Sequence, residues 1–377
     1  MEDIKMAATK GRYTLLKPEL DAAFSAVMAH GMAGNGEEVS RMARSLEAYA
    51  AVAHAIPCAT GADAFRLALL SLDLPAGAEV VLPAFNDPKA AGLVSSLGYT
   101  PVFADVLPDT FTLDPVSVKN VLSPRTMAIV PVHLYGQCAP MQDLMALAEE
   151  HSLWVVEDCT QAWGAVYQGY EGKARRAGSL GHVAFATFFP TKPFIGAGEA
   201  GAVLTNDAAL YKRMLQRTDA GQNIPMSGGP AEAAPTLDAL QAAMLEVKIK
   251  HYDALQAERQ EVARYYDSAF EPVGLVRAPK RASYSTHVFQ HYTIIVAPSL
   301  RDGLREHLLQ RHIPSEVYYP YPLCWQQADA HPIPITGCPV SEKLSQSLLS
   351  LPIHTALQED QLEYICQHVL EYILQVG

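Results

Sequence analysis

Residues 153–161 read Leu-Trp-Val-Val-Glu-Asp-Cys-Thr-Gln, an apolar run that ends in two carboxylates. The run predicts a strand buried on both faces, which is typical of a parallel sheet. On either side of it, short apolar runs alternate with helical patterns up to about residue 240. Such alternation requires crossover connections, so the sequence predicts an α/β fold with a mainly parallel central sheet flanked by helices.

The expected elements can be placed along the chain. Helices are expected at 62–72, 88–97 and 141–150, and strands at 79–83, 101–104, 127–132, 153–156, 183–188 and 202–205. A Gly- and Pro-rich loop at 221–235 precedes a long helical stretch at 237–270, broken at most once. We expect a large α/β domain over 1–245 and a smaller C-terminal α+β domain over 246–377.

Composition excludes several classes of protein. The 377 residues are 49% hydrophobic and carry a net charge of −12, without a basic block, which argues against a nucleic-acid partner. No apolar run has the length of a membrane span or a signal peptide. The six cysteines are scattered without a C-x-x-C pair, so neither a disulfide framework nor a zinc site is expected. We therefore expect a cytoplasmic protein without a bound metal or a membrane partner.

Two residues at strand ends suggest chemistry. Ligands of open α/β sheets bind beyond the carboxyl ends of the strands. Asp158 lies at such an end and would keep a cofactor's pyridine nitrogen protonated, although a solvated turn residue fits this segment equally well. Lys192 follows the apolar run Phe185–Phe188, where a lowered pKa would suit an amine that forms Schiff bases. On that segment alone, a lysine reaching out to solvent is the alternative.

Three further segments have weaker signals. The turn at 58–61 leads directly into a helix, whose first amides at Gly61, Ala62 and Asp63 would cradle a phosphate. Residues 196–201 match G-x-G-x-x-G, but a strand-like run follows, so a turn between strands is expected instead of a dinucleotide site. His133 is expected to be a hydrogen-bonded core histidine.

Taken together, these segments resemble the DegT/DnrJ/EryC1/StrS family of sugar aminotransferases, which depend on pyridoxal phosphate (PLP). The resemblance spans nearly the whole chain. It is carried by residues 31–36 with Glu47, Cys58–Leu70, Pro131–Gln137 (PVHLYGQ), Val156–Ala165 (VEDCTQAWGA), Phe188–Lys192 (FFPTK), Leu237–Ala243 and Leu351–Ile353.

The resemblance implies a type I PLP-dependent aminotransferase fold and a homodimer with the active site at the interface. It implies that Lys192 holds the cofactor as a Schiff base, that Asp158 pairs with the pyridine nitrogen, and that Gln161 lies near the ring hydroxyl. Thr187 stands where the family has a phosphate-binding serine, and the amides at Ala62 and Asp63 also hold phosphate.

The sequence departs from the family pattern around the expected cofactor. The ring-stacking aromatic is replaced by Asp87, unless Phe85 or Trp163 covers the ring instead. The other departures are Ala62 for a threonine of the phosphate turn, 234–236 for the N-x-R that reaches the partner subunit, and Tyr318 for a histidine.

The resemblance implies transfer of an amino group from an amino acid, glutamate by family, to a keto-sugar that is nucleotide-linked in some members. Two alternatives stay open: a relative that binds PLP but has a regulatory role or lost activity, motivated by Asp87, and another PLP reaction such as sugar dehydration. Dehydratases carry a histidine in place of the lysine, so Lys192 argues against the latter. A third alternative is a nicotinamide oxidoreductase, and its only support is the G-x-G-x-x-G match at residues 196–201.

Overall fold

A computed structural model describes residues 4–7, 9–30, 36–189, 192, 194, 198–218, 234–325 and 337–376, without the side chains of 9–12 and 30. Within these residues the largest sheet has seven strands in the order β1-β9-β8-β5-β4-β2-β3. Strand β9 (Gly201–Thr205) runs antiparallel to both of its neighbours, β1 (His54–Cys58) and β8 (Val183–Thr187). The other neighbouring pairs are parallel, which confirms the predicted fold class.

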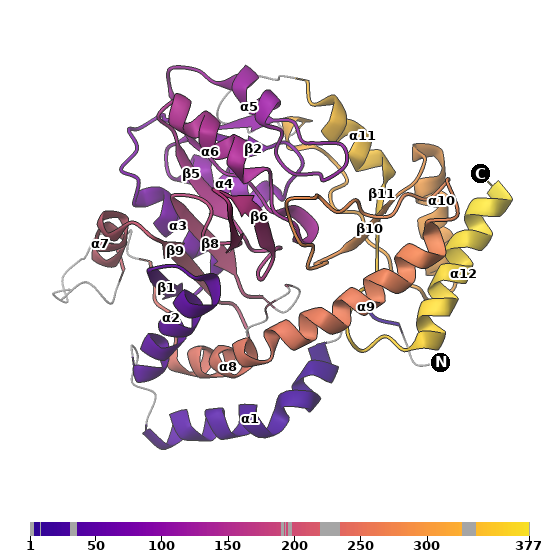
Figure 1. Ribbon diagram of the computed structural model, residues 1–377, viewed down its shortest axis with the longest axis horizontal. Helices are drawn as coiled ribbons and strands as arrows, with labels where there is room; N and C mark the ends of the chain where they lie inside the picture. Colours follow the sequence, from indigo (N-terminus) through magenta and orange to yellow (C-terminus); the bar gives the residue numbers. More distant parts are fainter. Residues whose placement is uncertain are drawn as a thin grey trace.

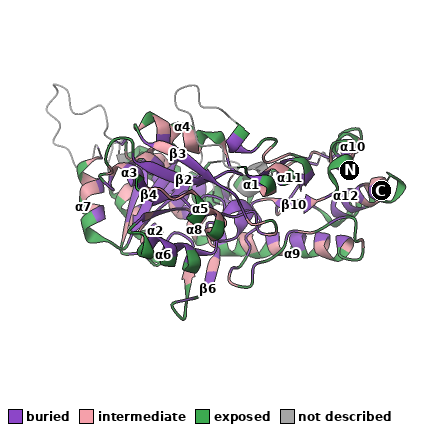
Figure 2. Ribbon diagram, turned by 90° about the horizontal axis from the view of Figure 1, so that it is seen from above, coloured by how far each residue is buried: buried purple, intermediate pink, exposed green. Residues whose placement is uncertain are grey.

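The parallel part of the sheet follows the predicted alternation closely. Its remaining strands are β2 (Glu79–Pro83), β3 (Thr100–Ala104), β4 (Thr126–Ile129) and β5 (Trp154–Asp158). Strand β4 is shorter than the expected 127–132, because Pro131 cannot donate a ladder hydrogen bond. Figure 2 shows these strands buried between helices whose outer faces are exposed.

Helices cover both faces of the sheet (Figure 1). One core contains side chains of α2 (Glu37–Ala50), α6 (Met141–Glu150) and α8 (Ala239–Lys250). The core on the opposite face contains side chains of α3 (Gly61–Leu70), α4 (Pro88–Ser96) and α7 (Ala208–Gln216). Successive β5 residues belong to opposite cores, since Val155 lies in the first and Val156 in the second.

The remaining described elements are α1 (Thr9–His30), α5 (Pro115–Val121), the turn η1 (Leu134–Gly136), and the hairpin of β6 (Val166–Tyr170) and β7 (Lys173–Arg176). Their placement leaves the sheet's β5 and β8 ends next to the start of α3, since α3 contacts β8 and β9.

The C-terminal third has its own hydrophobic core. Helix α9 (Tyr252–Phe270) contributes Val262 and Tyr266 to it, and α12 (Glu359–Val376) contributes Ile365 and Val369. The other elements are η3 (Leu323–Trp325), α10 (Pro298–Leu309), α11 (Pro339–Ser347) and the antiparallel pair β10 (Tyr292–Ile295) and β11 (Leu348–Leu351).

The predicted division at residue 245 stays a prediction, and this position lies inside α8. The long helical stretch is interrupted once, at His251 between α8 and α9. Most of the predicted 221–235 loop, and Gly196 and Ala197, lie outside the described residues. No helix in the described part of the chain combines the length and apolar character that crossing a membrane requires.

Candidate active site

Strand alternation separates the two carboxylates of β5. Glu157 points into the first core and is fully buried. Its carboxylate accepts hydrogen bonds from His133 Nε2 at 2.9 Å and from the amides of Leu180 and Gly181 at 2.9 and 3.0 Å. His133 Nδ1 accepts from Ala139 N at 3.1 Å, so the structure places His133 in the core as expected. Asp158, one residue on, faces the opposite side.

Asp158 lines a cavity of about 450 Å³ beyond the ends of β5 and β8, together with Lys192. Burial raises the pKa of Asp158, while hydrogen bonds from Thr160 and the charge of Lys192 oppose the rise. Burial lowers the pKa of Lys192, and the charges of Asp158 and Asp87 oppose that fall. The cavity therefore contains an amine with an increased neutral fraction beside a carboxyl group that favours a cation.

The start of α3 forms one wall of the cavity. Gly61 approaches β8 so closely that a Cβ atom there would lie 1.9 Å from Thr187 Oγ1. Thr60, Gly61, Ala62 and Thr187 all line the cavity. Helix starts offer unpaired amides to an anion, and Gly61 is the residue that lets the backbone come this near.

Asp63 is differently placed from the other predicted phosphate residues. Its amide donates to Thr60 Oγ1 at 3.0 Å, and its carboxylate accepts from the same hydroxyl at 2.7 Å. Thr60 is thus the N-cap of α3 and satisfies this amide. The structure therefore leaves Gly61 and Ala62, without Asp63, to face the cavity.

Gln161 lies on the cavity wall in a fixed orientation. Its Oε1 accepts from Tyr135 N at 3.1 Å, and its Nε2 lies 3.4 Å from the Tyr319 hydroxyl. Thr160 connects the two strand ends, because its Oγ1 accepts from Thr187 N at 3.1 Å.

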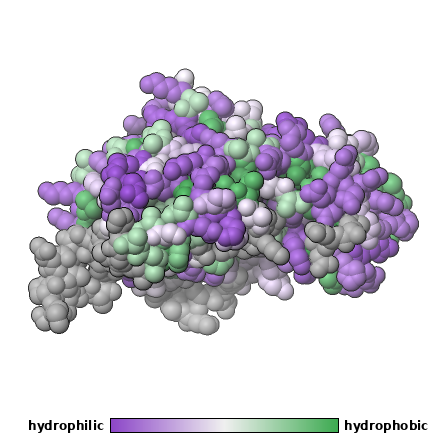
Figure 3. Space-filling model, turned by 90° about the horizontal axis from the view of Figure 1, so that it is seen from below, coloured by the Kyte–Doolittle hydropathy of each residue, from purple (hydrophilic) through white to green (hydrophobic). Residues whose placement is uncertain are grey.

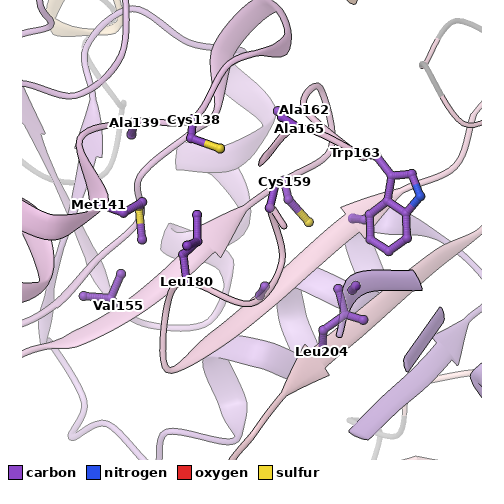
Figure 4. Close-up of a cluster of buried hydrophobic side chains, with 14 of the residues drawn as sticks. Cys138, Ala139, Met141, Val155, Cys159, Ala162, Trp163, Ala165, Leu180 and Leu204 are labelled. Atoms are coloured by element: carbon purple, nitrogen blue, oxygen red, sulfur yellow. The ribbon is translucent and has the colours of Figure 1, made fainter. Parts of the chain in front are cut away.

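Neither of the expected substitutes for the ring-stacking aromatic reaches the cavity. Trp163 is 1% exposed and lies in the core with Cys159 and Leu204 (Figure 4). Its ring stacks on that of Tyr49. Phe85 is completely buried. Asp87 lines the cavity and caps α4 by accepting from Lys89 N at 2.9 Å. A carboxylate therefore occupies the cavity position where the resemblance implies an aromatic residue.

Several cavity residues were not predicted from the sequence. Thr60 had a usable signal, since it lies in the turn at 58–61 just before the helix predicted at 62–72. The C-terminal part contributes residues without a local motif. The polar residues missed are Thr60, Asn86, Lys89, Thr160, Glu199, Gln290, His291 and Tyr319.

These residues fit PLP. The backbone at Gly61 suits the phosphate of PLP. The carboxyl group of Asp158 suits the ring nitrogen, and the amine of Lys192 suits the aldehyde. A dinucleotide is not supported, because residues 196–201 lead into β9 and not into a helix. The segment 234–236, which stands where the family has N-x-R, lies beside the end of β1: Pro235 O accepts from Ala59 N at 3.0 Å.

Comparisons with known proteins identify the family of the chain. Residues 15–370 match the model of the DegT/DnrJ/EryC1/StrS aminotransferase family. A pleiotropic regulatory protein of Geobacillus stearothermophilus is 36% identical, with 98% of both chains covered. The UDP-2-acetamido-2-deoxy-3-oxo-D-glucuronate aminotransferase of Pseudomonas aeruginosa is 33% identical over 96% of this chain and 98% of its own.

A solved structure gives the same result for the fold. The crystal structure of DesV from S. venezuelae, in complex with a ketimine intermediate, superposes with a TM-score of 0.91. It is 33% identical and covers 100% of both chains. The chain therefore belongs to the DegT/DnrJ/EryC1/StrS aminotransferase family and has the type I PLP-dependent aminotransferase fold.

Proposed function

We propose that this enzyme moves an amino group from glutamate to the carbonyl carbon of a nucleotide-linked keto-sugar. Aminotransferases of this family depend on PLP, so the reaction class and cofactor follow from membership. The sugar assignment is supported by the Pseudomonas aeruginosa relative, whose name specifies a UDP-linked 3-oxo sugar. The observation that carries the proposal is that Lys192 and Asp158 line one cavity.

Each residue has a role in the proposal. Lys192 holds the cofactor covalently through its amine, and Asp158 keeps the ring nitrogen protonated. Gln161 lies near the ring hydroxyl, while Thr187 and the amides of Gly61 and Ala62 bind the phosphate. When bound, PLP supplies an electron sink for the carbon that loses its proton.

Lys192 also serves as the general acid and base. Its amine must lose and regain a proton at neutral pH, and burial lowers its pKa toward that range. Asp158 and Asp87 limit how far it falls. The same amine can therefore take the proton from the donor's Cα and return it at the next step of the transfer.

A homodimer and a cytoplasmic location complete the proposal. Helix α1, at the bottom of Figure 1, carries the exposed apolar side chains Leu15, Phe24 and Met28. Figure 3 shows the molecule from below, where apolar side chains lie between hydrophilic ones. All six cysteines are free, consistent with a reducing compartment.

The test is a half-reaction. Purified enzyme reconstituted with PLP should absorb visible light, and glutamate should convert the spectrum to that of the aminated cofactor. Lys192→Ala should abolish both the covalent attachment and the conversion. Lys89→Ala, which removes a second lysine from the same cavity, should retain both. Transamination by Lys192→Ala at the wild-type rate would reject the assignment.

A regulatory role is the second candidate, because the 36%-identical relative is named a regulatory protein and Asp87 faces the cavity. Here PLP would be bound and coloured, but no amino donor would change its spectrum. The half-reaction therefore separates the two candidates.

A further inference from the structure

Three metal-ligand side chains meet between two helices of the C-terminal part. His368 and Glu371 lie three residues apart on α12, which places them on one face, and His307 lies in the last turn of α10. The two helices pack side by side (Figure 1). His368 Nδ1 lies 2.8 Å from Glu371 Oε2, and His307 Nε2 lies 4.0 Å from the same oxygen.

The distances are close to those of a coordination shell. All three ligand atoms lie within 4.8 Å of one another. Two ligands bound tetrahedrally to zinc at about 2.0–2.1 Å are about 3.3 Å apart. Two of the observed distances, 2.8 and 4.0 Å, bracket this value, and no pair exceeds 4.8 Å, so side-chain rotation would have to draw the three ligand atoms together.

One of the three ligand atoms is a buried nitrogen without a hydrogen bond. His307 Nε2 is buried and has no hydrogen-bond partner among the described residues. A buried polar nitrogen without a partner is costly. The Glu371 Oε2 atom lies 4.0 Å from it, too distant to accept a hydrogen bond. A cation between them would satisfy this nitrogen.

We propose that His307, His368 and Glu371 bind one divalent transition-metal ion, with zinc as the preferred ion, and thereby fasten α10 to α12. Two imidazoles and one carboxylate are ligands that zinc accepts and that magnesium and calcium disfavour. Glu371 keeps a third of its side chain exposed, 34%, so water can take the fourth position.

The charges around the site permit a cation. Glu371 contributes one negative charge, and the carbonyl end of α10 beside His307 is the negative pole of that helix. Arg311 opposes binding, but its Nη1 donates to the His307 carbonyl oxygen at 3.2 Å. Tyr364 and Tyr372 are the aromatic neighbours, with ring contacts to His368 and His307.

The sequence did not predict this site. His307 and His368 are distant in the chain, and no short spacing connects them. The site is independent of the cavity at Lys192, so its failure would leave the proposed function untouched.

The experiment uses the full-length, PLP-loaded enzyme with zinc chloride and cobalt chloride. Equilibrium dialysis should give one zinc per chain, and cobalt should produce visible bands of tetrahedral coordination. Thermal melting should shift upward with zinc. Circular dichroism and the PLP spectrum check that each variant is folded.

His307→Ala and His368→Ala should each weaken zinc binding by more than the roughly 10–100-fold that losing an outer-shell partner costs. His312→Ala, which removes an exposed histidine just beyond α10, should bind zinc like the wild type. No zinc or cobalt bound by the wild type would overturn the proposal. Unchanged affinity in the folded double variant of His307 and His368 would overturn it as well.

Discussion

Gly61 and Thr187 meet where α3 begins and β8 ends, with no room between them for a methyl group. Gly61→Ala should therefore push α3 away from the strand, because the new Cβ would also lie 2.6 Å from Thr187 Cβ. We expect PLP affinity to fall by about tenfold or more, since the amides that face the phosphate move. Titration of the apoenzyme with PLP measures this.

Gly92→Ala is the matched control for that substitution. Gly92 lies inside α4 with open space around its Cβ position. Alanine there should stabilise the protein by about 1 kcal/mol without changing PLP affinity. Thr187→Gly removes the opposing atoms but also a hydroxyl that the proposal assigns to the phosphate, so the double variant should lose less PLP affinity than the two single losses combined. Fully additive losses would contradict the steric explanation.

Asp158→Asn tests the carboxyl group opposite Lys192. The amide keeps the shape but cannot favour a positively charged ring nitrogen, so kcat should fall by about 10²-fold or more. The PLP spectrum should show a ring pKa lowered by about 1–3 units. Asp63→Asn is the control, because the Asp63 carboxylate accepts from the N-cap residue Thr60 and does not line the cavity. An unchanged ring pKa in Asp158→Asn would remove the proposed role.

Asp87→Asn isolates the charge where the family has an aromatic residue. The negative charge of Asp87 opposes the lowering of the Lys192 pKa, so its removal should lower that pKa further. The pH midpoint for capture of PLP by the apoenzyme should therefore shift downward. Asp114→Asn is the control, because Asp114 caps α5 as Asp87 caps α4. An upward shift would be incompatible with this geometry.

His287 should make the fold sensitive to acid. Burial, with the charge of Arg281, lowers its pKa from 6.5 to about 3. The unfolded chain then takes up the proton first, so the free energy of unfolding should fall by about 1.4 kcal/mol per pH unit from pH 6.5 toward pH 3. His287→Gln should reduce that slope in urea unfolding, while the exposed His151→Gln should not.

The parallel sheet and the residues at its strand ends were predictable, because hydrophobic periodicity and the alternation of strands with helices can be read from short stretches of sequence. Asp158, Gln161 and Lys192 follow apolar runs, and all three line one cavity, while their roles toward a cofactor stay a prediction. Gln290, His291 and Tyr319 could not be found in this way, because their place depends on how the C-terminal part packs. The position of Trp163 was missed for a similar reason: its core partner Tyr49 comes from α2.

Glu157→Gln should destabilise the fold. An amide cannot accept from His133, Leu180 and Gly181 together, so a buried donor loses its partner. We expect a loss of about 3 kcal/mol or more in the free energy of unfolding. The exposed Glu150→Gln is the control in the same urea titration. Stability equal to that of the wild type would show that water replaces the carboxylate.

The adjacent acids of β5 make catalysis dependent on strand register. Because neighbouring residues point to opposite faces, a slip by one position would bring Glu157 to the cavity and Asp158 into the core. Such a slip would leave His133 and the amides of Leu180 and Gly181 without an acceptor, so chains folded in the wrong register would be unstable as well as inactive. The hydrogen bonds of Glu157 in the core thus favour the register that brings Asp158 to the cavity.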